Sequence, residues 1–124
     1  MAEDEPEILR FYKVLLEDLG YDIVTAKDGQ ECLDAYRAAS NAGSRFDLVI
    51  LDYRMPKMNG MEVANKIAAS APSQKLLMIT AYSGLLGPEQ KPEDMKIMSK
   101  PFEVDELVST IKELLDKHLS DRRP

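Results

Sequence analysis

Short and long apolar patterns alternate along this chain. Leu48–Leu51 and Leu76–Ile79 are continuously apolar and have the length of buried strands. Weaker strand patterns cover Tyr21–Ala26 and Met95–Ser99. Elsewhere, apolar residues recur every three or four positions, as on one face of a helix. The segments with this spacing are 6–19, 30–42, 59–71 and about 103–119. The alternation predicts an α/β fold with a doubly wound parallel sheet, which helices cover on both faces.

Residues that begin and end helices support these boundaries. Pro6 lies among acidic residues, which favour the positive end of a helix dipole, and Gly20 follows the first helix. Asn59 is of a type that caps helices, and it precedes the third one. The stretch Gly84–Asp94 is the least regular part, because its glycines and prolines allow only a short helix.

Polar residues end the apolar runs. Asp52 directly follows Leu48–Leu51, where a carboxylate has no role in packing. Because the carboxyl ends of parallel strands meet at one crevice, we expect Asp52, Thr80 and Lys100 to lie together there. The acidic pair Glu3-Asp4 is expected to join them. The topology therefore predicts one site assembled from distant parts of the chain.

The residue types in this predicted site favour phosphoryl chemistry. Carboxylates that share a crevice repel one another, and a hard divalent cation such as Mg²⁺ relieves this repulsion while it binds a phosphate. Lys100 supplies a point charge for a phosphate oxygen, and Thr80 supplies a hydroxyl donor. Asp52 as a nucleophile would form an aspartyl phosphate.

Composition narrows the class of protein. The 124 residues suit one domain, which we place at 1–119 with a short polar tail at 120–124. A net charge of −6 argues against nucleic acid as a partner. The sequence has no apolar run of membrane-spanning length and no signal-peptide pattern. Cys32 is the single cysteine, which fits a reducing compartment, so we expect a cytoplasmic protein.

The motifs together resemble the receiver domain of two-component response regulators. The matching pieces are Glu3-Asp4-Glu5-Pro6, Leu51-Asp52-Tyr53-Arg54-Met55-Pro56 with Asn59-Gly60, Ile79-Thr80-Ala81 and Ser99-Lys100-Pro101-Phe102. They occur in the family's order and cover nearly the whole chain. The resemblance implies a flavodoxin-like sheet with the strand order 2-1-3-4-5.

The resemblance also implies a role for Asp52. It would accept a phosphoryl group from the phosphohistidine of a histidine kinase or a phosphotransfer protein. Glu3 and Asp4 would hold Mg²⁺ together with Asp52 and the backbone carbonyl of Arg54.

Further roles follow from the same resemblance. Lys100 would contact the phosphoryl group, and Thr80 would move toward it as the switch. The Lys100–Pro101 peptide bond would be cis. Output would come from binding another protein or from a phosphorelay, and the protein would catalyse only its own phosphorylation and dephosphorylation.

The sequence departs from the family pattern in two places. Only Met1 and Ala2 precede the acidic pair, where the family has a full apolar strand in the middle of the sheet. A truncated start, a strand borrowed from another chain, or a rearranged sheet would each explain this. We therefore expect a chain that is less stable than a full receiver, or an oligomer with strand exchange. In addition, Ile97 stands where the family often has an aromatic residue that rotates on phosphorylation.

Two alternatives come from other classes of protein. The first is a non-switching module that keeps the fold and binds proteins without phosphotransfer, a pseudo-receiver. The short start and Ile97 favour it, whereas Asp52, Thr80 and Lys100 oppose it. The second is a phosphatase with an aspartate nucleophile. Such enzymes generally carry a second aspartate two residues later, where this chain has Arg54.

Arg54 and Tyr82 generate a prediction about the lifetime of the phosphoryl group. In the family, these positions border that group, so bulky side chains there hinder the attacking water. We expect the Tyr82→Ala variant to lose phosphate faster than the wild type, as measured by the decay of the phosphorylated mass. Faster loss from the wild type would contradict this interpretation.

Overall fold

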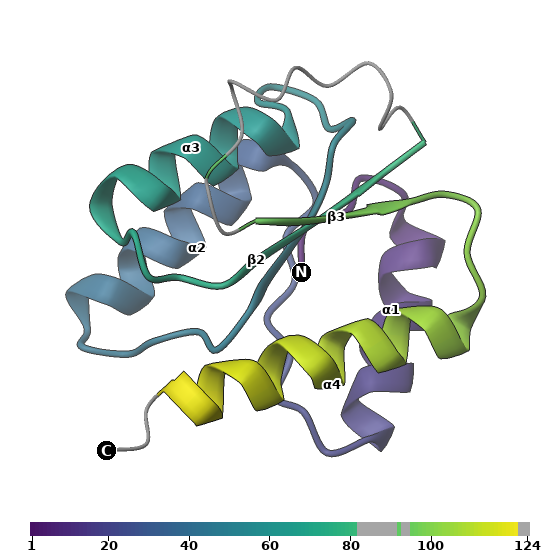
Figure 1. Ribbon diagram of the computed structural model, residues 1–124. Helices are drawn as coiled ribbons and strands as arrows, with labels where there is room; N and C mark the ends of the chain where they lie inside the picture. The colour runs from purple at the N-terminus through teal and green to yellow at the C-terminus, as the bar shows by residue number, and fades with distance from the viewer. Residues whose placement is uncertain (82–91, 93–94, 122–124) are drawn as a thin grey trace.

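The computed structural model describes residues 1–81, 92 and 95–121 of the chain (Figure 1). Its elements are α1 (Pro6–Asp18), α2 (Gly29–Asn41), β1 (Val49–Asp52), α3 (Gly60–Ser70), β2 (Leu76–Thr80), β3 (Lys96–Ser99) and α4 (Val104–Asp121). The predicted alternation is thus confirmed over α2-β1-α3-β2 and at β3-α4, whereas α1 and α2 follow one another without a regular strand in the described residues between them. Most of the stretch Gly84–Asp94 lies outside the described residues.

The regular sheet is parallel, in the order β1-β2-β3. β1 pairs with β2 in the register Leu51↔Met78, and β2 pairs with β3 in the register Ile79↔Met98. Every residue of β1 and of the central strand β2 is buried. Burial on both faces explains why these two strands are continuously apolar in the sequence.

Met1–Glu3 forms a rudimentary strand beside β1. The Ala2 amide donates to the Ile50 carbonyl at 2.8 Å, and the Asp52 amide donates to the Ala2 carbonyl at 3.0 Å. On the other side, the Ala26 amide donates to the Met1 carbonyl at 2.9 Å. Ala2 is accordingly bridged in parallel to both Ala26 and Leu51. The segment therefore lies in the middle of the sheet, and the order from Ala26 to β3 reproduces 2-1-3-4-5 without rearrangement.

The predicted strand Tyr21–Ala26 is wrong in its extent. Only Ala26 is bridged, and the residues before it have no regular strand structure. A regular strand forms only where a neighbouring strand can pair with it along its length. Met1–Glu3 offers only a few residues, so the β-branched pattern at Ile23 and Val24 has little backbone to pair with.

Two helical layers enclose the sheet. α2 and α3 cover one face, while α1 and α4 cover the other (Figure 1). The core beneath α2 and α3 includes Leu33, Val49, Leu51, Val63, Ile67 and Met78. The core beneath α1 and α4 includes Leu16, Ile50, Leu77, Ile79, Leu107 and Ile111. Successive strand residues thus enter opposite cores, as the period of two along a strand requires.

Helix ends follow local chemistry. Asn59 caps α3, since its side chain accepts from the Glu62 amide at 2.9 Å while Glu62 reaches back to the Asn59 amide. Gly20, with φ +96°, lies just beyond α1. α4 continues to Asp121, so the predicted tail at 120–124 begins inside a helix. Among the described residues, no helix has both the length and the apolar composition of a membrane span.

Leu107 provides a test of the packing between α4 and the sheet. Its side chain is fully buried, so Leu107→Ala should lower the free energy of unfolding by about 2–5 kcal/mol. Val14→Ala is the matched control, because Val14 is 53% exposed on α1 and should change stability by less than about 0.5 kcal/mol. Urea unfolding followed by circular dichroism measures both, and equal effects would contradict the packing described here.

Candidate active site

The carboxyl ends of the strands bring the predicted site residues together. Asp52 ends β1, Thr80 ends β2 and Lys100 follows β3. Met1–Glu3 runs parallel to β1, so the same edge of the sheet receives Glu3 and Asp4. Asp52, Thr80 and Glu3 are buried, whereas Asp4 is exposed.

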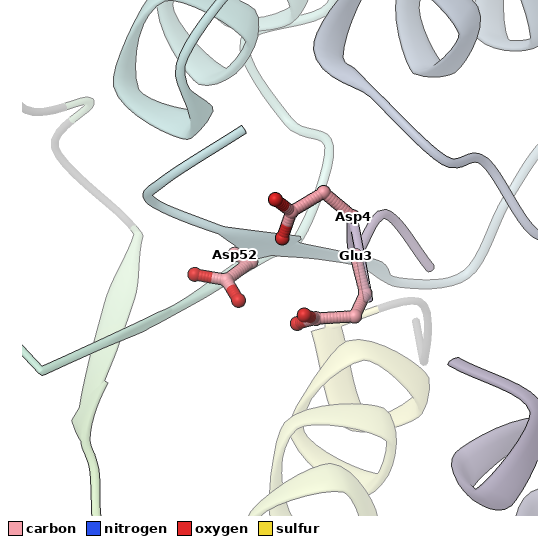
Figure 2. Close-up of side chains that lie close together, drawn as sticks. All are labelled: Glu3, Asp4 and Asp52. Atoms are coloured by element: carbon pink, nitrogen blue, oxygen red, sulfur yellow. The ribbon is translucent and has the colours of Figure 1, made fainter. Parts of the chain in front are cut away.

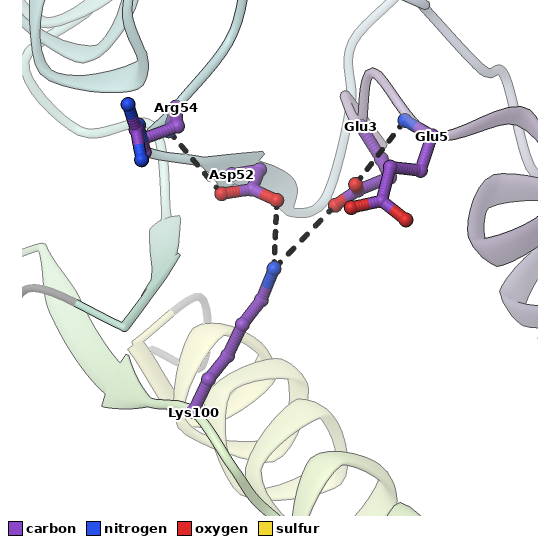
Figure 3. Close-up of polar contacts among 5 residues, drawn as sticks. All are labelled: Glu3, Glu5, Asp52, Arg54 and Lys100. Atoms are coloured by element: carbon purple, nitrogen blue, oxygen red, sulfur yellow. Dashed lines mark hydrogen bonds and ion pairs between the residues drawn. The ribbon is translucent and has the colours of Figure 1, made fainter.

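Lys100 and Asp52 form the central ion pair of this site. The Lys100 Nζ lies 2.8 Å from Asp52 Oδ2 and 3.9 Å from Glu3 Oε2 (Figure 3). Burial alone would lower the pKa of Lys100, but the hydrogen bond that its ammonium group donates to Asp52 and the charges of both carboxylates outweigh burial and raise the pKa. The ammonium group therefore stays charged at neutral pH. The Arg54 amide also donates to Asp52 Oδ1, at 3.3 Å.

Glu3 has the most perturbed carboxyl group at this site. Burial raises its pKa to about 8, and the hydrogen bond and negative charge of neighbouring Asp52 add to the shift. Lys100 and the Glu5 amide, which donates to Glu3 Oε1 at 3.3 Å, oppose the shift without cancelling it. The protein alone thus lacks the positive charge needed to keep both buried carboxylates ionised.

The carboxylates are placed to share a metal ion. One oxygen from each of Glu3, Asp4 and Asp52 lies within 4.8 Å of the others. Figure 2 shows Glu3 and Asp4 directing their carboxylates to the side where Asp52 lies. This all-oxygen set fits the hard cation Mg²⁺, which binds proteins through few carboxylates and keeps several waters. A divalent cation here would supply the missing positive charge.

An open cleft of about 690 Å³ gives access to these groups. Its lining comprises Asp4, Glu5, Asp52, Tyr53, Arg54, Met55, Pro56, Asn59, Thr80, Ala81 and Lys100. The sequence analysis named Asn59 as a helix cap and as part of a family motif, and it did not single out Glu5. The signal for Glu5 was its place directly after Asp4 in the chain.

The remaining predictions for this site concern Arg54, Ile97, Tyr82 and the Lys100–Pro101 peptide bond. Arg54 is exposed, and its guanidinium extends away from the Asp52–Lys100 pair (Figure 3). Ile97 is half-buried on β3 and packs against the core beneath α2 and α3. The Lys100–Pro101 peptide bond is cis, as the resemblance implied. Tyr82 lies outside the described residues.

Comparison with known families identifies the chain. Residues 1–112 match the response regulator receiver domain. The chain belongs to this receiver domain family. Among curated relatives, the receiver protein CpdR of Brucella abortus is 31% identical over 117 residues, which cover 93% of both chains. The response regulator ArlR of Staphylococcus aureus is 34% identical over 119 residues, which cover 93% of this chain and 51% of ArlR. The receiver thus spans about half the length of ArlR.

Solved structures confirm the flavodoxin-like receiver fold. The response regulator TrrA of Thermotoga maritima, in complex with Mg²⁺ and BeF, is 35% identical and superposes with a TM-score of 0.76 over 91% of this chain and 94% of TrrA. TrrA in complex with the histidine kinase ThkA gives a TM-score of 0.78 at 35% identity, over 92% and 94% of the two chains. A CheY-like receiver of Methanospirillum hungatei, 26% identical, gives 0.77 over 97% and 94%.

The charge balance at the site generates a prediction about Lys100. Lys100→Ala leaves two buried carboxylates without their ammonium partner, so the free energy of unfolding should fall by about 1–3 kcal/mol without metal. Because the variant site is more negative, MgCl₂ should stabilise it more than it stabilises the wild type. Urea unfolding with and without MgCl₂ measures both effects.

Lys112→Ala is the matched control, because Lys112 is exposed on α4 and does not line the cleft. Equal stabilisation of the wild type and Lys100→Ala by MgCl₂ would show that Lys100 does not balance charge at this site.

Proposed function

We propose that this receiver domain takes a phosphoryl group onto Asp52 from the phosphohistidine of a histidine kinase or a phosphotransfer protein, in a reaction that depends on Mg²⁺. One observation carries the proposal. Asp52 is a buried carboxylate at the open end of a parallel sheet, 2.8 Å from a lysine and within metal-sharing distance of Glu3 and Asp4.

The proposed transfer is a single displacement at phosphorus. An oxygen of Asp52 attacks the phosphorus atom, the P–N bond to the imidazole breaks, and the ring nitrogen keeps the electron pair. Lys100 neutralises charge on the transferring group, and the Thr80 hydroxyl donates to one of its oxygens. Mg²⁺ held by Glu3, Asp4, Asp52 and the Arg54 carbonyl would neutralise further charge when bound.

The proposed dephosphorylation transfers the phosphoryl group from Asp52 to water. Water attacks the phosphorus atom, the P–O bond to Asp52 breaks, and the carboxylate is restored as inorganic phosphate leaves. The chain thus acts on itself and turns over no separate substrate, so we propose that it is not an enzyme in the usual sense. Similarity to TrrA, which has been solved with Mg²⁺ and BeF and with the kinase ThkA, supports this reading.

The proposed output is a change of surface after phosphorylation. Thr80 ends the central strand β2, so movement of its hydroxyl toward the phosphoryl group would alter the segment that follows. The altered surface would bind another protein, or the phosphoryl group would pass along a relay. Ile97 takes the place of the aromatic switch residue. A cytoplasmic location and assembly into a homo-oligomer by strand exchange stay predictions.

Ile97 favours a second candidate function, the non-switching pseudo-receiver. An aliphatic side chain that packs into the core cannot rotate as an exposed aromatic residue does. In this alternative, the fold and its charge cluster remain, but phosphorylation does not occur or does not change partner binding. The two functions differ in whether Asp52 responds to phosphoryl donors.

Asp52→Asn tests the proposed phosphoacceptor. Acetyl phosphate with MgCl₂ should add the mass of one phosphoryl group to the wild type and none to the variant, because an amide oxygen is a far weaker nucleophile than a carboxylate. Beryllofluoride with MgCl₂ should likewise shift amide NMR signals around Thr80 and Lys100 only in the wild type. Intact-mass spectrometry and NMR provide the readouts.

Asp22→Asn is the matched control, because Asp22 is exposed and does not line the cleft. It should retain full phosphorylation. A wild type that gains no mass and shows no response to beryllofluoride would favour the pseudo-receiver. Phosphorylation that persists in Asp52→Asn would place the acceptor elsewhere.

A further inference from the structure

The loop that follows Asp52 shapes the proposed phosphoacceptor site. Residues 53–59, here called the acceptor loop, contribute Tyr53–Pro56 and Asn59 to the cleft lining. Both ends of the loop are fixed by backbone hydrogen bonds. The Tyr53 amide donates to the Ile79 carbonyl at 2.9 Å, and the Gly60 amide donates to the Tyr53 carbonyl at 2.8 Å.

The middle of the acceptor loop lies against the first turn of α2. Gly29 begins α2, and its Cα faces the backbone of Met58. A Cβ atom on Gly29 would overlap the Met58 carbonyl oxygen, and it would lie 2.8 Å from the carbonyl carbon and 2.9 Å from the Met58 Cβ. Because the obstructing atoms belong mainly to the backbone, a side chain at position 29 would have to displace the loop itself.

Asp28 makes a second contact with the same loop. Its buried carboxylate caps α2 through Oδ1, which accepts from the Glu31 amide at 2.8 Å. The other oxygen, Oδ2, lies 3.6 Å from Lys57 Nζ. Lys57 has φ +68°, a left-handed conformation that lysine seldom adopts, so the loop bends sharply at the residue that meets Asp28. The cap therefore fixes a carboxylate that faces this bend.

We propose that Asp28 and Gly29 are positioning residues for phosphoryl transfer. Gly29 lets the Met58 carbonyl lie against α2, and Asp28 holds Lys57 beside it. Together they set the position of the acceptor loop, and hence of Arg54, whose carbonyl is a proposed Mg²⁺ ligand. Neither residue lines the cleft or touches the reacting atoms. The inference rests on the proposed function, and it assigns the N-terminus of α2 a part in that function.

The backbone contact is the stronger of the two. Lys57 is 67% exposed at its side chain, and an ion pair so exposed to solvent contributes little. Overlap with a backbone carbonyl, in contrast, cannot be relieved by rotating a side chain. We therefore expect a larger effect from Gly29 than from Asp28.

Gly29→Ala tests the inference against Gly43→Ala. Gly43 has φ +79° just beyond the other end of α2, and a Cβ there meets no atom within 4 Å. Alanine at Gly43 strains the backbone without touching the acceptor loop, so it controls for loss of stability. Gly29→Ala should weaken Mg²⁺ binding about 10- to 100-fold by calorimetry, the range typical of residues that orient metal ligands. Gly43→Ala should leave the Mg²⁺ affinity unchanged.

A readout in the metal-free protein separates this inference from the proposed function. Gly29→Ala should shift the amide NMR signals of Arg54 and Gly60 without any added ion, whereas Gly43→Ala should not. Unchanged Arg54 and Gly60 signals would overturn the positioning role, whether or not the wild type accepts phosphate. If Gly29→Ala shifts these signals while the wild type takes no phosphoryl group, Gly29 positions the acceptor loop and the proposed function is rejected.

Asp28→Asn serves as a second variant should Gly29→Ala fail to fold. Asparagine keeps the α2 cap but removes the charge that faces Lys57. We expect the Arg54 amide signal to shift and Mg²⁺ affinity to fall about two- to fivefold, the size expected for an exposed ion pair. Asp34→Asn, an exposed position on α2, is the control. An Arg54 signal that matches the wild type in Asp28→Asn would overturn the role of Asp28.

Discussion

Repulsion between carboxylates at the end of the sheet is the interaction on which this structure depends. Glu3 and Asp52 are both buried, and burial together with the neighbouring Asp52 raises the pKa of Glu3. Lys100 offsets part of that cost, from 2.8 Å to Asp52 and 3.9 Å to Glu3. The remaining excess of negative charge favours the binding of a divalent cation at this site. The same charges would be destabilising in a domain without such a ligand.

The sheet must hold these charges in place, and it does so with few residues. Met1–Glu3 occupies the central position between Ala26 and β1 and forms backbone hydrogen bonds on both sides. This short segment brings Glu3 into the site in register with Asp52. The helical layers then bury alternate strand residues in two separate cores. The topology of the sheet therefore decides where the charged groups of the site lie.

Close backbone contacts restrict which residues fit in and beside the loop at the end of the sheet. The acceptor loop packs against α2 so closely that only glycine fits at position 29. Gly60 is similarly confined, because a Cβ there would overlap the Asp52 carbonyl and lie 2.9 Å from Met78 Sδ. Both glycines thus serve close backbone approach, and neither has a positive φ. Such contacts connect α2 to the loop that follows Asp52.

The sequence by itself determined the α/β class, the strands around Asp52 and Thr80, and the convergence of the polar strand ends. Buried parallel strands leave continuous apolar runs, and their carboxyl ends must meet, so local pattern and topology suffice. Tertiary structure decided the rest. Whether Tyr21–Ala26 forms a strand depends on the length of its neighbour, and the raised pKa of Glu3 depends on burial beside Asp52. Gly29 and Met58 are far apart in the sequence, so no local sequence pattern predicts that they are in contact.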